Sequence, residues 1–413
     1  MDQEQKSIPQ PRNKFWFATY DFSNSGFLII FQSFLFPILL AQAAEGSSIN
    51  GDTVWSTVVT ISSILAIISA PFLGRFADAF GKGVTFAVVV TLTGTLALLS
   101  PAIFDNNVVF LAIMFVLFNT FFELSQSLYD SFLLNLEKTK EGIAKLSTFA
   151  WGFGYLGGVL FLAVYFIADR IFELNTVTIL MISAALFLLL SLPSIESFNK
   201  LASKGKNTFK QISLGYLLKT RPPVPIRDIF IYWVIADTVA AITYFAPIFI
   251  SKEIGLSMEM VGGLLLSGQL LAFPLTILSG RIAAKIGTIK ALRYSLIIWF
   301  GSLLLLSFAN SLTDLIPVII GLAFVFGSTQ SLLRSHFASR IEERYSGEGL
   351  GYFAIAQKSA SVAAPLIVTV SIAFSDSYRP AIIAFSFLIA AGFFLLPRLG
   401  NEKKIVVDSQ LTA

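Results

Sequence analysis

Charged side chains in the middle of apolar stretches are the residues of this sequence that could do chemistry. Asp237 and Lys358 each lie near the centre of an apolar run of about 20 residues, and Glu123 lies deep in another. A charge inside a bilayer is costly, so it usually faces a cavity or a partner. Either carboxylate could exchange protons or bind an ammonium group, and Lys358 could anchor a carboxylate. The alternative is a structural tie between helices, for example from Asp237 to Lys358.

A second polar group opens the first apolar run, in residues 20–27 (YDFSNSGF). Asp21 and Asn24 are three residues apart, which places them on one face of a helix. They form either the cytoplasmic wall of a transport path or a tie to a neighbouring helix. Four glutamines also lie within apolar runs, and together these groups could line a sparsely charged central cavity. The glutamines are Gln126, Gln269, Gln330 and Gln357.

The elements that must position these groups are membrane helices. Apolar residues make up 55% of the 413 and charged residues 13%, with a mean hydropathy of +0.77, whereas soluble domains carry about 25% charged residues. We therefore predict an all-α integral membrane protein with 12 transmembrane helices. The expected spans are 15–40, 53–73, 84–104, 108–134, 144–168, 176–194, 227–250, 258–280, 289–309, 314–338, 349–374 and 378–397.

The distribution of basic residues predicts an orientation. Of the 29 Lys and Arg, only Arg170, Lys252 and Arg379 lie in the set of loops opposite to the one on the side of the termini, which places both termini in the cytoplasm. A basic stretch, 195–226, reads as a cytoplasmic linker between two six-helix halves, 1–194 and 227–400, with 401–413 as a cytoplasmic tail. Its charge suits lipid headgroups better than nucleic acid, because no recognition module accompanies it.

The two halves repeat one another. Residues 74–81 and 280–287 both read G-R-x-A-x-x-x-G at a shift of 206, and residues 126–131 match 330–335 at a shift of 204. Parallel repeats of this kind occur in transporters. The shifts single out loop and gating candidates in both copies. These candidates are Gly74, Arg75, Asp78, Gly81, Lys82, Gly280, Arg281, Gly287, Asp130 and Arg334.

The first copy of the loop motif carries a carboxylate that the second lacks. We expect its glycines to form a tight turn and Asp78 to face a helix N-terminus or a cation, closing the cytoplasmic side. The alternative is an ordinary charged loop whose basic residues only follow the positive-inside rule. Ala284 stands at the equivalent place, so this closure would be asymmetric. Asp130 and Arg334 occupy equivalent positions with opposite charge, so they could form an ion pair between the halves or be solvated separately.

The motif GRFADAFGK at residues 74–82 resembles the signature of the major facilitator superfamily between its helices 2 and 3. Further segments resemble the autophagy-associated vacuolar effluxer-like branch of that superfamily, over nearly the whole chain. They are YDFSNSGF (20–27), YDSFL (129–133), WGFGYLGG (151–158), Arg334-Ser335, GYF (351–353) and Lys358. The resemblance implies a secondary transporter, with amino-acid-like solutes as a weak lead. Asp130, where the branch often has Asn, and Ala364-Pro365, where Gly-Pro is usual, depart from the pattern.

The favoured function is therefore a secondary transporter, proton- or gradient-coupled, that works by alternating access. The second hypothesis is a transporter-fold receptor that binds a ligand without moving it. An enzyme is not expected, because the chain has no Cys and one His, predicted to lie at the surface (His336), and no ATP-binding loop is present. We expect no cofactor, no metal site and no nucleic-acid partner. The expected partners are a small solute or ion, protons and the bilayer, for a functional monomer in a bacterial inner membrane.

Overall fold

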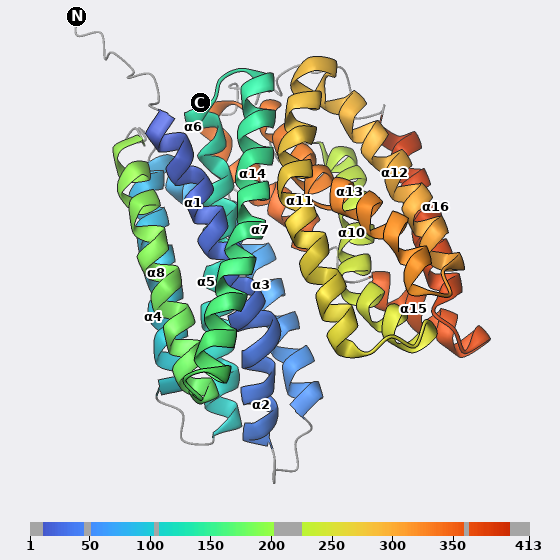
Figure 1. Ribbon diagram of the computed structural model, residues 1–413. Helices are drawn as coiled ribbons and strands as arrows, with labels where there is room; N and C mark the ends of the chain where they lie inside the picture. The colour runs from blue at the N-terminus through green and yellow to red at the C-terminus, as the bar shows by residue number, and fades with distance from the viewer. Residues whose placement is uncertain (1–10, 45–50, 103–106, 202–224, 359–362, 397–413) are drawn as a thin grey trace, which may run out of the picture.

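The computed structural model describes residues 11–44, 51–102, 107–201, 225–358 and 363–396, and their regular structure is helical (Figure 1). The first half contains α1 (Pro11–Phe27), the π-helical segment η1 (Leu28–Leu35), α2 (Phe36–Ala44), α3 (Gly51–Phe80), α4 (Lys82–Ala102), α5 (Val108–Ser131), α6 (Leu133–Leu136), α7 (Lys140–Arg170) and α8 (Thr176–Leu201). The second half contains α10 (Ile226–Glu253), α11 (Met258–Ile286), α12 (Thr288–Phe308), α13 (Leu312–Ser339), the 3-10 turn η3 (Glu343–Tyr345), α14 (Ser346–Lys358), α15 (Ala363–Ser375) and α16 (Arg379–Leu395).

These helices form two bundles that lie side by side, as predicted. Figure 1 shows the first half in blue and green beside the second half in yellow, orange and red. The first span runs through α1, η1 and α2, and the eleventh is composed of α14 and α15. The contact between the bundles is made by α3, α5 and α7 of the first half and α11, α13 and α14 of the second, with α3 and α5 against α14 and α7 against α11 and α13.

Within the described residues, nine helices are individually long and apolar enough to cross a membrane. α10 completes a further span with a bend of 41° between its parts 226–243 and 245–253. Pro247 explains this bend, because proline lacks an amide hydrogen and its ring clashes with the carbonyl four residues earlier. The 12-helix architecture with two halves matches the expectation from the sequence.

Several helices extend beyond the predicted spans at one face of the bundle. We call this the inner face: α1 begins there, α3 ends there, and the basic residues predict that it is cytoplasmic. α3 continues to Phe80 and α11 to Ile286, so the loop interpretation of 74–80 and 280–286 is wrong. Only Gly81 and Gly287 form the turns, with φ of 131° and 91°, values that glycine adopts readily. The error arose because polar residues in an amphipathic helix end resemble a loop in composition.

Candidate functional site

A buried arginine joins the two halves near the inner face. Arg334, on α13 of the second half, is fully buried. Its Nη1 donates to Asp130 Oδ1 of α5 at 2.9 Å and lies 3.5 Å from Asp21 Oδ2 of α1. Its Nε and Nη2 donate to the Oγ and the carbonyl oxygen of Ser147 on α7, each at 2.9 Å. The guanidinium therefore binds three helices of the opposite half.

Aromatic rings enclose this group, which we call the Arg334 cluster (Arg334, Asp21, Asp130, Ser147 and Tyr129). The guanidinium carbon lies 5.1 Å from the ring centre of Trp151 and 5.6 Å from that of Tyr129, distances at which a cation is attracted to a ring face. Tyr129 also donates its hydroxyl to Asp21 Oδ2 at 3.2 Å. The cluster has two carboxylates for one guanidinium, so its formal charge with both ionised is −1.

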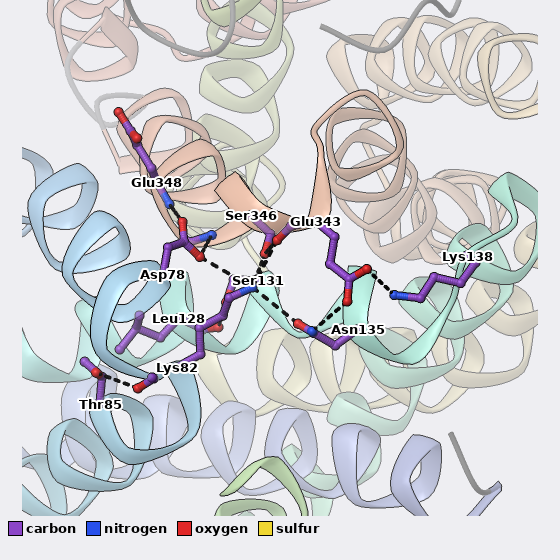
Figure 2. A network of polar contacts seen from close by, with 12 residues as sticks. Asp78, Lys82, Thr85, Leu128, Ser131, Asn135, Lys138, Glu343, Ser346 and Glu348 are labelled. Atoms are coloured by element: carbon purple, nitrogen blue, oxygen red, sulfur yellow. Dashed lines mark hydrogen bonds and ion pairs between the residues drawn. The ribbon is translucent and has the colours of Figure 1, made fainter. Parts of the chain in front are cut away.

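Asp78 clamps the start of a helix from the other half, as Figure 2 shows. Its carboxylate accepts hydrogen bonds from the amides of Gly347 at 3.0 Å and Glu348 at 2.9 Å, in the first turn of α14. An acceptor at this position pairs amides that have no partner within the helix, and its charge suits the positive end of the helix dipole. Arg75, one turn before Asp78, forms an ion pair with Glu348. The helix N-terminus expected for Asp78 is thus that of α14.

Lys82 completes the clamp. Its Nζ lies 3.4 Å from Asp78 Oδ1, donates to the carbonyl oxygen of Glu343 at 3.3 Å, and contacts Ser346 Oγ. Figure 2 shows this amino group between the helices of the two halves, where Asn135 also binds Glu343. The contacts of Arg75, Asp78 and Lys82 with 343–348 are called the Asp78 clamp below.

Two glycines allow the clamp to form. A Cβ atom on Gly74 would lie 2.1 Å from the carbonyl oxygen of Gly347, and one on Gly347 would lie 2.3 Å from that of Gly74. Backbone therefore packs on backbone where α3 crosses α14. Only glycine at both positions permits this approach.

The polar groups deeper in the bundle are only partly brought together. Asn24 donates its side-chain amide to Gln126 across α1 and α5. Gln269 of α11 lies against α7, since a Cβ on Gly158 would lie 2.8 Å from Gln269 Oε1. The side-chain oxygens of Gln269 and Gln330 are buried and have no hydrogen-bond partner among the described residues. These acceptors lie on helices that contact the opposite half.

The remaining predicted residues lie outside this arrangement. Glu123 and Asp237 are buried on α5 and α10, and each interacts with other residues of the chain. Gln357 is half-buried on α14, and the side chain of Lys358, the last residue of α14, lies outside the described residues. The Asp237–Lys358 tie stays a prediction.

The structure also contains functional candidates that the sequence did not reveal. Ser147 and Glu348 lack any pattern that marks them, although the helix dipole predicts an acceptor opposite the polar start of α14. Tyr129 lies in the YDSFL segment (129–133), but the sequence assigns it no role. The prediction of a surface histidine is wrong, because His336 is 2% exposed. Its ring centre lies 6.3 Å from that of Tyr232 on α10, and Arg340, just after α13, pairs with the buried Asp228 of α10.

Comparisons with known proteins decide the family. A family model described as Major Facilitator Superfamily matches residues 22–365. The chain belongs to the Major Facilitator Superfamily. It is therefore a membrane transporter by family, and not an enzyme.

Individual relatives are distant in sequence. The chain is 22% identical over 412 residues to the MFS-type transporter YxiO of Bacillus subtilis (strain 168), with 95% of each chain covered. Among solved structures, the human organic anion transporter MFSD10 has a TM-score of 0.71 at 14% identity, covering 94% of this chain and 100% of that one. FucP in the outward conformation has a TM-score of 0.73 at 12% identity, covering 94% and 98%. At these identities the structures show the shared fold alone.

Proposed function

We propose that the protein is a secondary active transporter that moves a small polar solute by alternating access. The observation that carries this proposal is the Arg334 cluster, an ion network buried between two halves that must separate if the inner face is to open. Apolar residues of similar volume often stabilise a buried contact as well as an ion pair does, so the network is weak evidence for stability. Charged groups can instead be rehydrated when the halves part, which suits a contact that forms and breaks.

The conformation described is closed at the inner face, where the Asp78 clamp and the Arg334 cluster both join the halves. In alternating access, a closed inner face corresponds to the outward-facing state. The similarity in fold to FucP in its outward conformation supports this assignment. It is supported as well by a bacterial homologue of the iron transporter ferroportin in its outward-facing state, with a TM-score of 0.71 at 12% identity.

The balance of charges in the Arg334 cluster favours Asp21 as the proton-coupling residue. Arg334 can neutralise only one of its two carboxylate neighbours, and it lies closer to Asp130 than to Asp21. A proton on Asp21 would remove the excess negative charge, whose burial is costly. Asp237 and Glu123 are the second candidates for coupling, and Lys358 for anchoring a carboxylate.

The substrate is proposed from chemistry and resemblance. The unpaired oxygens of Gln269 and Gln330 and the Asn24–Gln126 pair offer hydrogen bonds to a polar solute. Resemblance to the vacuolar effluxer-like branch favours amino-acid-like solutes and efflux. The printed names of structural neighbours range from an organic anion transporter to a proton:xylose symporter, so the fold itself does not select a substrate.

The proposed setting is a bacterial inner membrane with both termini in the cytoplasm, which places the inner face there. The halves, 1–194 and 227–400, are joined by the linker 195–226, whose first residues continue α8 to Leu201. The proposed unit is a monomer that needs lipid, solute and protons.

A ligand screen followed by a transport assay tests the proposal. A thermal-shift screen of amino acids, peptides and sugars on the purified protein identifies a ligand, whose uptake is then measured in proteoliposomes with an imposed pH gradient. We expect gradient-driven accumulation in the wild type and exchange without accumulation in Asp21→Asn. The control Glu196→Gln, at an exposed position of α8, should behave as wild type.

The outcomes separate the alternatives. Saturable binding without counterflow in any variant would favour the receptor hypothesis. If Asp237→Asn uncouples while Asp21→Asn does not, the proton-coupling role belongs to Asp237.

A further inference from the structure

The repeat places two equivalent contacts at the inner face, but only one of them is closed by a carboxylate. A shift of 206 maps Asp78 onto Ala284, and the shift of 204 found for residues 126–131 maps Gly347, in the first turn of α14, onto Ile143, in the first turn of α7. Ala284 has no side-chain acceptor. The first turn of α7 is capped instead by its own Thr139, whose Oγ1 accepts from the amide of Gly142 at 3.0 Å.

The ion pair of the clamp is also missing from the second copy. Arg281 is the equivalent of Arg75 at a shift of 206, whereas the equivalent of Glu348 at a shift of 204 is Ala144, which has no charge. Among the described residues, no ion pair is formed by Arg281 or by its neighbour Lys285. The second copy thus retains the arginine of the motif but has no carboxylate at the positions equivalent to Asp78 and Glu348.

A cavity occupies the place of the missing contact. It has a volume of about 690 Å³ and lies between α7 of the first half and α11 of the second. Four charged residues line it: Glu141 and Lys145 from α7, and Arg281 and Lys285 from α11. With three cations and one carboxylate, the lining carries a formal charge of +2.

The lining changes from charged to apolar along both helices. On α7, Phe149 follows Lys145 by one turn toward the membrane interior, and on α11, Ile277 and Leu278 precede Arg281 by about one turn in the same direction. The cationic part therefore lies nearer the inner face and the apolar part deeper. An anionic head with an apolar tail has the matching distribution.

We propose that this cavity binds an anionic phospholipid of the leaflet at the inner face. The phosphate lies between Arg281, Lys285 and Lys145, and an acyl chain covers Phe149 and Ile277. Basic pockets between transmembrane helices commonly bind such headgroups. The lipid contacts one helix from each half. Its phosphate therefore provides, in the second copy, the negative charge that the Asp78 side chain provides in the first. The site stands on its own geometry, although its effect on the transport cycle rests on the proposed function.

Lipid binding by the full-length protein tests the proposal. Native mass spectrometry measures retention of phosphatidylglycerol against phosphatidylcholine by the wild type, by Arg281→Gln/Lys285→Gln and by a matched control, Lys200→Gln/Lys290→Gln. The control removes two exposed inner-face cations outside the cavity. We expect the first variant to weaken phosphatidylglycerol binding about 30-fold, from the loss of two cations near a membrane surface. The control should leave it within about threefold.

A second variant and two ligand arms keep the test decisive. Ala284→Asp adds the missing anion to the cavity and should also lower phosphatidylglycerol retention, without removing a cation. Equal losses in the cavity variant and the control, or equal retention of both lipids, would overturn the proposal. Binding of glycerol phosphate or inorganic phosphate as tight as that of the lipid would assign the cavity to a soluble phosphate compound instead. None of these readouts depends on transport, so a failed transport assay leaves the lipid site standing or falling by itself.

Discussion

At the scale of single residues, Arg334 determines how the inner face closes. Its positive charge is shared by two carboxylates and a backbone carbonyl of the other half, all in a buried environment. Removing the cation takes the guanidinium away from two buried carboxylates, and breaking a buried pair in this way costs about 3–5 kcal/mol. Removing one of the anions as well should recover part of that cost.

A double-mutant cycle measures this coupling. We expect Arg334→Gln to lower the free energy of unfolding by about 3 kcal/mol or more, and the double variant Arg334→Gln/Asp130→Asn to be destabilised by clearly less than the sum of the single variants. Arg344→Gln breaks an exposed pair with Glu342 and should cost less than about 1 kcal/mol. Additive effects of the Arg334 and Asp130 substitutions in detergent-solubilised protein would contradict the pairing.

At the scale of helices, the crossing of α3 and α14 depends on backbone contact at Gly74 and Gly347. A methyl group at residue 74 would meet the carbonyl oxygen of Gly347, so the two helices must move apart. The displacement acts on the contact between halves, whereas each half keeps its own packing. An alanine there should therefore favour an open inner face.

Glycine-to-alanine variants test this expectation, with distances between spin labels as the readout. The chain has no cysteine, so labels at Lys200→Cys and Lys290→Cys, one on each half, report the separation of the inner ends. Gly74→Ala should enlarge the long-distance population and lower the free energy of unfolding by about 1–3 kcal/mol. Gly301→Ala on α12, where an added methyl has no neighbour within 4 Å, should leave the distances unchanged and be neutral or stabilising. Identical distance distributions in the two variants would show that the glycine contact does not control opening.

The same scale shows what the sequence could predict. Apolar length gave the twelve spans, because the bilayer imposes it, and the repeat shift aligned Asp130 with Arg334, which the fold brings within 2.9 Å. The ends of α3 and α11 were underestimated, because polar residues at the end of an amphipathic helix resemble a loop in composition. Ser147 and Glu348 could not be predicted, because their roles depend on how one half packs against the other.

At the scale of the whole molecule, closure at the inner face has two unlike parts. The first copy of the motif is held by the Asp78 clamp, and the second contains a cationic cavity. Charged side chains therefore join the two bundles where α3 meets α14. Where α7 meets α11, the cavity instead leaves room for an anion that is not part of the chain. The balance between inward- and outward-facing states then depends on the leaflet as well as on the chain.

If the halves must separate for transport, tying them together at the inner face should stop it. Lys138 and Glu343 form an ion pair at 2.7 Å across the halves, on partly exposed side chains. Lys138→Cys/Glu343→Cys, joined by a short reducible crosslinker, should lose solute counterflow and regain it on reduction. Glu196→Cys/Lys200→Cys places the same crosslink within α8, where it joins no moving parts and should leave counterflow unchanged. Counterflow that persists in the crosslinked Lys138/Glu343 variant would show that solute crosses without separation of the halves, and alternating access as proposed would be wrong.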